Sequence, residues 1–200
     1  LSILARDKEA DDLYIRIVAE SNDEALALRA ARRAIDDLTW RDDLDALSKA
    51  WLPLLRTGQR KNLYLDILLQ TADAQSQPLI TAVQTRSPQQ AYVARHRLRE
   101  LSETYSQVVV ESLLSNDASL SGRALELSRW LASASVVGVL GQKIEQAPAT
   151  AIGRSMQLQA VMGIAYSQLP AAVPILKECL GTHYSRAVRE HALWLSLIHI

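Results

Sequence analysis

Cysteine is almost absent from this sequence, and phenylalanine is absent altogether. The single cysteine, Cys179, excludes an internal disulfide framework and suits a reducing compartment, so we expect a cytoplasmic protein. No apolar run approaches the roughly 18 residues of a membrane-spanning helix, and residues 1–12 have too short an apolar stretch for a signal peptide. The sequence therefore predicts no membrane contact.

A surplus of charge of either sign is also lacking. The sequence contains 22 Lys and Arg residues and 22 Asp and Glu residues, and the two signs also balance within residues 1–100 and within residues 101–200. A basic arm or groove for nucleic acid would need a local excess of Lys and Arg. We therefore expect no nucleic-acid partner.

What the sequence does contain is apolar residues at helical spacing. Between residues 25 and 38, strong helix formers surround one apolar stripe, which consists of Leu28, Ala31, Ile35 and Leu38. Alternating β-branched runs, which would indicate strands, are nearly absent. Similar helical segments along the whole chain predict an all-α protein of about eleven or twelve helices.

Local signals mark where several helices begin. Ser21 and Glu24 have the spacing of a capping box, in which both side chains bond to free amides at a helix start. Ser87 before Pro88 is a second start, since serine caps helices and proline fits the first helical position. The segment from Lys61 is expected to begin a third helix.

Other residues predict where helices stop. Residues 39–40 indicate a turn, and Pro53 is expected to kink or end the helix that contains it. Pro78 is expected to interrupt a short element over residues 75–84. A further break is predicted between a helix ending near Tyr105 and a short helix over residues 106–114. Gly181 is expected to end a helix in the left-handed conformation.

A pattern of four apolar positions recurs along the chain. Two, four, seven and eight residues after Arg123 the side chains are apolar, and the same holds after Arg154 and after Lys61. After Arg186 three of the four are apolar, and the full set is Leu63, Leu65, Leu68, Leu69, Leu125, Leu127, Trp130, Leu131, Met156, Leu158, Val161, Met162, Val188, Glu190, Leu193 and Trp194. A spacing of about 31 residues between Arg123 and Arg154 indicates a helical repeat. Because offset two lies nearly opposite the other three, we expect these helices to be buried on two sides.

Paired helices of this length, with Arg or Lys near the start of the second and small and aliphatic residues after it, resemble short bacterial HEAT-like repeats. The resemblance covers about residues 58–194, whereas the signature residues of tetratricopeptide repeats are missing. It implies an α-α superhelix, a HEAT-like solenoid that binds proteins or acts as a scaffold. We expect a single array over residues 1–194, and the pattern leaves open whether the repeat extends through residues 1–57.

Few residue groups could carry chemistry. Cys179 and His183 are four residues apart, with Glu190 and His191 nearby, which could form a nucleophile or part of a metal site. The absence of a second cysteine favours a buried thiol and two solvent-facing histidines instead. Paired acids such as Asp36 with Asp37 lie where carboxylates stabilise helix starts. We therefore expect no catalytic site, no cofactor and no metal, so the protein is not expected to be an enzyme.

A protein partner is expected, and four residues are candidates for contacting it. Arg95 and Arg99 share a helix face with Tyr92 close by, which would suit an acidic partner. Glu100 and Glu103 dilute this basic group, so a solvated helix face is the alternative. Trp40 falls at a predicted turn, where an exposed indole would serve as an anchor.

The two ends suggest a fragment of a longer reading frame. The chain begins with Leu1 instead of Met, and we interpret Leu195–Ile200 as the translation of a sequencing-adapter end, with the natural chain cut near Trp194. The alternative is that these residues are the apolar end of a last helix. No function is assigned to His199.

Two hypotheses of different class follow. The first is a protein-binding or scaffolding repeat module without a catalytic site of its own. The second is a non-repetitive helical domain of a larger enzyme or regulatory protein whose active part lies outside this fragment. A HEAT-like nucleic-acid-repair enzyme is less consistent with the sequence, because the balanced charge provides no basic groove.

Overall fold

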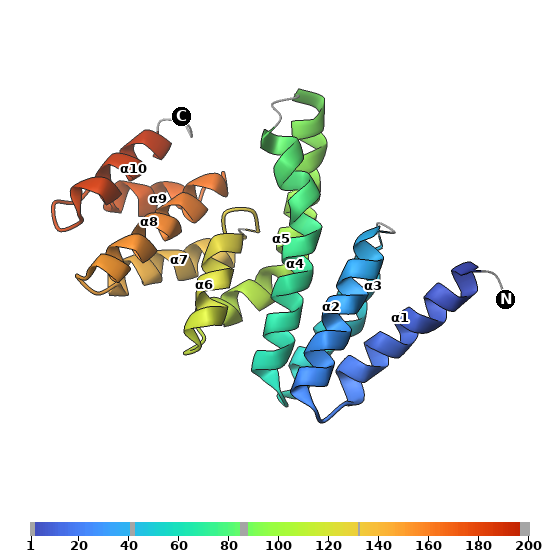
Figure 1. Cartoon of the computed structure of the whole chain (residues 1–200). Helices are drawn as coiled ribbons and strands as arrows, with labels where there is room; N and C mark the ends of the chain where they lie inside the picture. Colours follow the sequence, from blue (N-terminus) through green and yellow to red (C-terminus); the bar gives the residue numbers. More distant parts are fainter. Residues whose placement is uncertain (1–2, 41–42, 85–87, 132, 197–200) are drawn as a thin grey trace. The chain divides into compact units, whose positions relative to one another are not determined.

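The computed structural model describes residues 3–40, 43–84, 88–131 and 133–196 (Figure 1). Within those ranges all regular structure is helical, with ten α-helices, one 3-10 helix and no strand, which confirms the predicted all-α class. No helix in the same ranges is long and apolar enough to cross a bilayer. The chain divides into two compact units, residues 1–78 and residues 79–200. The division falls inside helix α4 (Lys61–Gln84).

The first unit contains α1 (Ile3–Glu20), α2 (Glu24–Trp40), α3 (Asp45–Trp51), the 3-10 helix η1 (Leu52–Thr57) and most of α4. Helix α1 packs against α2 and α3. Four alanines on one side of α2 are buried, Ala27, Ala30, Ala31 and Ala34. Their small side chains allow the backbone of a neighbouring helix to come close.

The start of α2 corrects the predicted capping box. Asp23 caps the helix, because its carboxylate Oδ1 accepts a hydrogen bond from the amide of Leu26 at 3.0 Å. The Ser21 hydroxyl instead accepts from the amide of Asp23 at 3.1 Å, which stabilises the turn before the helix. Aspartate and serine are equally good caps, so residue type alone could not decide between the two positions.

The prediction of a turn at residues 39–40 was also wrong. Helix α2 continues through Trp40, and the Thr39 hydroxyl donates to the carbonyl of Ile35 at 2.6 Å, one helical turn earlier. The effect of Pro53 was predicted correctly, since α3 ends at Trp51 and the chain continues as η1. Pro78, in contrast, lies inside a continuous α4, because the good helix formers around it tolerate the loss of one hydrogen bond.

Arg60 connects two turns of the first unit. It follows Gly58, which ends η1 with a φ of 70°, and has a positive φ of 51° itself. Its guanidinium donates to the carbonyl of Ser21 and lies 6.0 Å from the centre of the Tyr64 ring. The turn before α4 is thereby held against the turn between α1 and α2.

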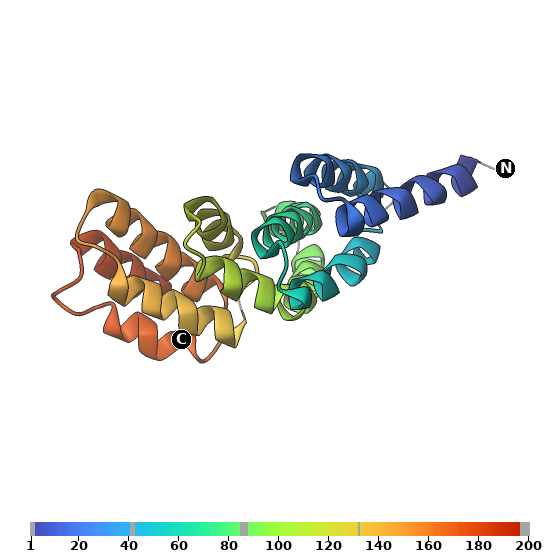
Figure 2. The same cartoon turned by 90° about the horizontal axis from the view of Figure 1, so that it is seen from below.

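The second unit contains α5 (Pro88–Leu113), α6 (Ala118–Leu127), α7 (Ala134–Gln146), α8 (Ala151–Tyr166), α9 (Ala172–Glu178) and α10 (Arg186–Ser196). Helices adjacent in sequence pack as the pairs α5 with α6, α7 with α8 and α9 with α10 (Figure 2). Contacts also join α5 to α7, α6 to α8 and α8 to α10, and α8 further contacts α9. Helix α8 is therefore surrounded by four others.

Polar side chains cap three helices of this unit. Asp117 caps α6 by accepting from the amides of Ser119 and Leu120, and hydroxyls cap α7 and α8 through Ser133 and Thr150. The predicted break near Tyr105 is wrong, because α5 runs without interruption to Leu113. Together with the continuous α4, this merger lowers the number of helices below the expected eleven or twelve. Gly181 is not left-handed, since among described glycines only Gly58 has a positive φ.

The expected two-sided burial holds in some repeat segments and fails in others. All four pattern residues of α4 are buried, whereas in α8 only Val161 is. Helix α8 is nevertheless buried on several sides through other positions, among them Ala160, Gly163 and Ile164. A Cβ atom on Gly163 would lie 2.6 Å from the Ser128 hydroxyl. Small residues, which the apolar pattern did not include, therefore determine how closely helices approach α8.

Candidate functional site

The four predicted partner-contact residues are distributed over both units. Trp40 is the last residue of α2 in the first unit, whereas Tyr92, Arg95 and Arg99 lie on α5 in the second. Arg99 is exposed. The side chains of the other three lie outside the described part of the structure. This set therefore remains a sequence-based hypothesis.

Acidic residues dilute the basic group on α5, as the sequence predicted. Nδ1 of His96 lies 3.4 Å from a carboxylate oxygen of Glu100, and an Arg97 guanidinium nitrogen lies 3.4 Å from the other. All three side chains are substantially exposed. This face of α5 has the features of a solvated helix surface, where such pairs contribute little stability.

The residues around Cys179 do not form a nucleophilic site. Cys179 is only 1% exposed, and burial, followed by the negative charges of Glu178 and Glu145, raises the pKa of its thiol to about 11. The thiol is therefore protonated at neutral pH and unreactive. His183 and His191 are exposed, which confirms the predicted buried cysteine and solvent-facing histidines. No group of three His, Cys, Asp or Glu side chains suited to a metal occurs in the described residues.

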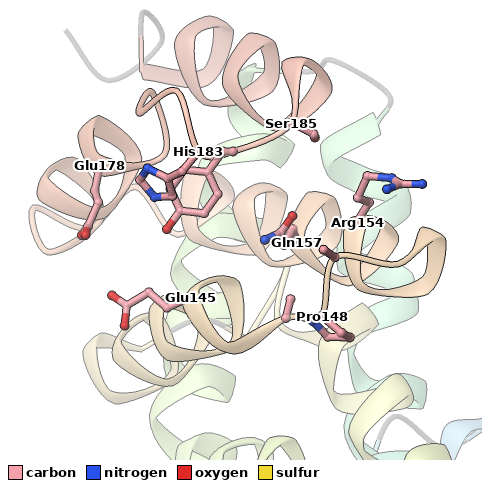
Figure 3. Close-up of a pocket in the computed structure, with 10 residues that line it drawn as sticks. Glu145, Pro148, Arg154, Gln157, Glu178, His183 and Ser185 are labelled. Carbon is pink, nitrogen blue, oxygen red and sulfur yellow. The ribbon is translucent and has the colours of Figure 1, made fainter.

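The structure instead reveals a pocket of about 460 Å³ in the second unit (Figure 3). It lies where the turn between α7 and α8 meets the turn between α9 and α10. Ten residues line it, namely Glu145, Ala147, Pro148, Ala149, Arg154, Gln157, Glu178, His183, Tyr184 and Ser185. Most of them lie at helix ends or in turns, where side chains are not part of the packed core.

The α7–α8 turn forms one wall of the pocket. Thr150 caps α8 through a 3.1 Å hydrogen bond from the amide of Gly153. A Cβ atom on Gly153 would lie only 1.9 Å from the carbonyl oxygen of Pro148, so glycine is required for this turn to fold back onto the helix. One turn further along α8, the Gln157 amide nitrogen donates to the carbonyl of Ile144 at 3.0 Å. That bond fixes Gln157 and leaves its Oε1 as an acceptor.

The α9–α10 turn supplies the opposite wall. Ser185 begins α10 by accepting from the amide of Val188 at 3.3 Å. The preceding Tyr184 is 7% exposed, and its ring centre lies 4.1 Å from that of His183. Its hydroxyl forms no hydrogen bond with any described residue. Tyr184 lines the pocket.

The pocket has a clear separation of charge. Figure 3 shows Glu145 and Glu178 on one side, Arg154 on the opposite side, and Gln157 between them. Burial raises the pKa of Tyr184, and electrostatic interactions with Cys179 in its thiolate form and with the carboxylates of Glu178 and Glu145 raise it further. Both carboxylates therefore act on the same hydroxyl. The arrangement suits binding of a polar, positively charged group, and it contains no activated nucleophile.

Sequence reasoning missed this pocket because its residues come from three helices and two turns. Arg154 was noted only as the start of a repeat, and Glu145 and Glu178 were not singled out. Glu145 and Glu178 lie at the ends of α7 and α9, next to the two turns that meet at the pocket. Comparison with protein-family models and with curated proteins finds no match for this sequence.

Proposed function

We propose that this chain is a protein-binding module whose second unit is a HEAT-like stack of helix pairs. The observation that supports the stack is the order of contacts, in which helices pack as pairs and three of them also pack against the equivalent helix of the next pair. The links α5 to α7, α6 to α8 and α8 to α10 follow this rule. Stacks of this kind leave surface residues free to vary, and they commonly bind proteins.

The chemistry of the described residues supports binding over catalysis. The only cysteine is buried and protonated, and the pocket carries no base paired with a nucleophile. Several large apolar side chains of α9, α10 and the turn between them are exposed, including Val173, Leu180, Leu193 and Trp194. Where exposed apolar residues form a contiguous patch, they mark surfaces that contact other proteins.

A second candidate is a helical domain of a larger enzyme or regulatory protein, and the first unit favours it. Its helices are unequal in length, at 18, 17, 7 and 24 residues, and α3 continues into a 3-10 helix. A regular repeat would produce helices of similar length. Because helix lengths in the second unit also vary, from 7 to 26 residues, the continuation of α3 into a 3-10 helix is the feature that sets the first unit apart. In this alternative the irregular helices of the first unit would support an active part elsewhere in a longer protein.

Site-specific photo-crosslinking tests the binding proposal. A photoreactive amino acid would replace exposed Glu103 on α5 or exposed Gln142 on α7, with exposed Lys49 in the first unit as the matched position. We expect one partner to crosslink from the second unit and to bind the purified chain directly. The proposal fails if no partner crosslinks at any position while the purified chain converts a small molecule.

The stack itself is tested by distances between spin labels. Labels on α5 and α7 should lie closer together than labels on α5 and α9, because a stack separates its first and third pairs. Exposed Gln107, Gln142 and Lys177 are suitable positions on these helices. Equal distances would indicate a closed bundle around one centre and would contradict the repeat.

A further inference from the structure

One side of α8 stays exposed although four other helices pack against it. Ile152 is 75% exposed and Tyr166 is 53% exposed, and Met156, Gln159 and Met162 between them are partly exposed. Residues at this spacing lie within about 120° of one another around a helix. These five residues therefore form one stripe, the α8 stripe, which runs about 21 Å along the helix. None of the five is charged.

The residue types of the α8 stripe are those of protein interfaces. Both methionines of the sequence, Met156 and Met162, lie on it. Methionine adapts its shape to a partner, and it is enriched where proteins meet, as are aromatic residues and arginine. At one end of the stripe the ring centre of Tyr166 lies 5.9 Å from that of Trp130, a residue of the turn between α6 and α7. The stripe thus ends at an aromatic pair suited to anchor a partner.

An unpaired arginine adjoins this aromatic pair in the chain. Arg129 directly precedes Trp130, and its side chain is partly buried. Its Nε atom is buried without a hydrogen bond, and its guanidinium forms no ion pair within the described part of the chain. Leaving a buried charged donor unsatisfied is costly, and a carboxylate is its strongest partner. The end of the stripe at Trp130 therefore favours an acidic group.

From these observations we propose that the α8 stripe binds an amphipathic helix of the protein partner, with an acidic residue placed to pair with Arg129. The proposal rests on the proposed function, since it identifies which surface the partner covers and by what chemistry. A helix of about 15 residues matches the length of the stripe, and apolar residues on one of its faces would cover the methionines and Ile152. Its carboxylate would supply the charge that the stripe lacks.

Two other occupants fit the same surface less well. A second copy of this chain, with its own α8 stripe facing this one, would bring only uncharged stripe residues to the surface. A lipid surface attracts clusters of lysine and arginine, whereas the stripe contains neither. An acidic amphipathic helix matches both the apolar stripe and the unpaired guanidinium.

Selection from a peptide library tests this proposal. The library displays helical peptides of about 15 residues, with leucine at the apolar positions and Glu, Gln or Lys at the others, and it is selected on the full chain. We expect the selected peptides to carry glutamate at one end. Replacing that glutamate with lysine should weaken the tightest peptide at least about fivefold. If no peptide is selected, or if the lysine peptide binds equally well, the proposed partner is wrong.

Matched variants locate the selected peptide. Met162→Gln keeps the length of the side chain and should weaken binding about tenfold, whereas Leu13→Gln, at a 48% exposed leucine of α1, should leave the affinity unchanged. Gln159→Glu adds a negative charge to the stripe and should also weaken an acidic peptide. Arg129→Gln should remove the preference for glutamate over lysine. Thermal unfolding verifies that each variant is folded, and binding unaffected by the three stripe and arginine variants would overturn the surface.

Two further measurements distinguish the occupants. Sedimentation equilibrium should give the same mass for the full chain and for Met162→Gln, and a dimer that this variant dissociates would make a second copy the occupant. Vesicles of phosphatidylcholine and phosphatidylserine should not bind the full chain, and binding that Met162→Gln abolishes would make a membrane the occupant. Either of these results would overturn the proposal.

The same variants separate this proposal from the proposed function. If the partner crosslinked from Glu103 or Gln142 binds Met162→Gln and Gln159→Glu as tightly as the unchanged chain, the α8 surface is wrong and the binding module stands. If no partner crosslinks at any position and the purified chain converts a small molecule, the binding module is wrong. Peptide binding that is lost in Met162→Gln would then still locate a helix-binding surface on α8.

Discussion

The two compact units both bury large apolar side chains, but they differ in how closely other groups approach their glycines. The first unit buries leucines of α4 and Trp51, which has no exposed surface, and the second buries Tyr105, Leu140 and Ile164. In the second unit, Gly141 and Gly163 also lie where an added Cβ atom would meet a side chain of another segment at 3.1 Å or less. Regular pairing in the second unit brings turns together, and the pocket lies at one such meeting of turns.

This difference shows where a binding site can arise in an all-helical chain. Side chains that fill a core are unavailable for binding, and the large residues of the first unit are used in this way. Turns between packed helices carry side chains that are not part of the core, and in the second unit a neighbouring turn supplies the opposite wall of the pocket. In the second unit, the candidate site is therefore formed mainly by the turns between helices and not by the faces of the helices.

The largest expected effect tests the role of large side chains in the first unit. Trp51→Ala should lower the free energy of unfolding by about 3–5 kcal/mol, because it removes a fully buried indole and leaves a cavity. Trp194→Ala is the control, since this indole is 71% exposed, and should change stability by less than about 0.5 kcal/mol. Urea unfolding followed by circular dichroism measures both. Similar losses from the two variants would contradict the described cores.

A smaller effect tests the close approach in the second unit. Gly163→Ala should cost about 1–3 kcal/mol, because the new Cβ would meet the Ser128 hydroxyl at 2.6 Å and a Leu140 methyl at 3.1 Å. Gly138→Ala on α7 meets nothing within 4 Å and should stabilise the protein by about 0.5–1 kcal/mol. Thermal unfolding should therefore show a lower midpoint temperature for Gly163→Ala and a higher one for Gly138→Ala. If both substitutions stabilise, close helix approach does not distinguish the second unit.

Helix capping gives a still smaller effect. Asp23→Ala should cost about 1 kcal/mol, since Asp23 accepts from an amide of the first turn of α2. Ser21→Ala should cost only a few tenths of that amount, because its bond lies in the exposed turn before the helix. Asp117→Ala in the second unit should match Asp23→Ala. If Ser21→Ala costs more stability than Asp23→Ala, Ser21 is the cap, as the capping-box prediction had it.

The all-α class and several helix starts could be predicted because they depend on local chemistry. Lys61, Pro88 and Arg186 begin helices where the sequence indicated. The prediction that Pro78 interrupts a short element was wrong. A proline removes one hydrogen bond, and the flanking turns of a 24-residue helix tolerate that loss. The turn expected at residues 39–40 was absent because a threonine can bond to its own helix.

The candidate site could not be predicted in the same way. Glu145, Gln157 and Glu178 are separated by many residues along the chain, and only packing of α7, α8 and α9 brings them together. The sequence did predict that Cys179 is buried, but it did not indicate the two carboxylates that act on it.

The smallest effect uses Cys179 as a reporter of the pocket, because it is the only thiol in the chain. Alkylation requires the thiolate, so its rate should be low at pH 7 and rise towards the pKa of about 11. Glu178→Gln removes a nearby negative charge, which should lower the pKa and speed alkylation at pH 9 by roughly twofold to fivefold. Glu126→Gln should leave the rate unchanged.

The pH dependence of the folding stability provides a second test of how the Glu178 carboxylate acts on Cys179. The folded thiol has a pKa of about 11 against an ordinary value of 9.0, so its contribution to stability is complete below pH 9 and is lost as the pH rises towards 11. Burial is the larger cause and remains in Glu178→Gln, so this variant should lose slightly less stability across that interval. Fast alkylation at pH 7, or an identical pH dependence in the variant, would show that the carboxylates of the pocket do not act on the buried groups of the second unit.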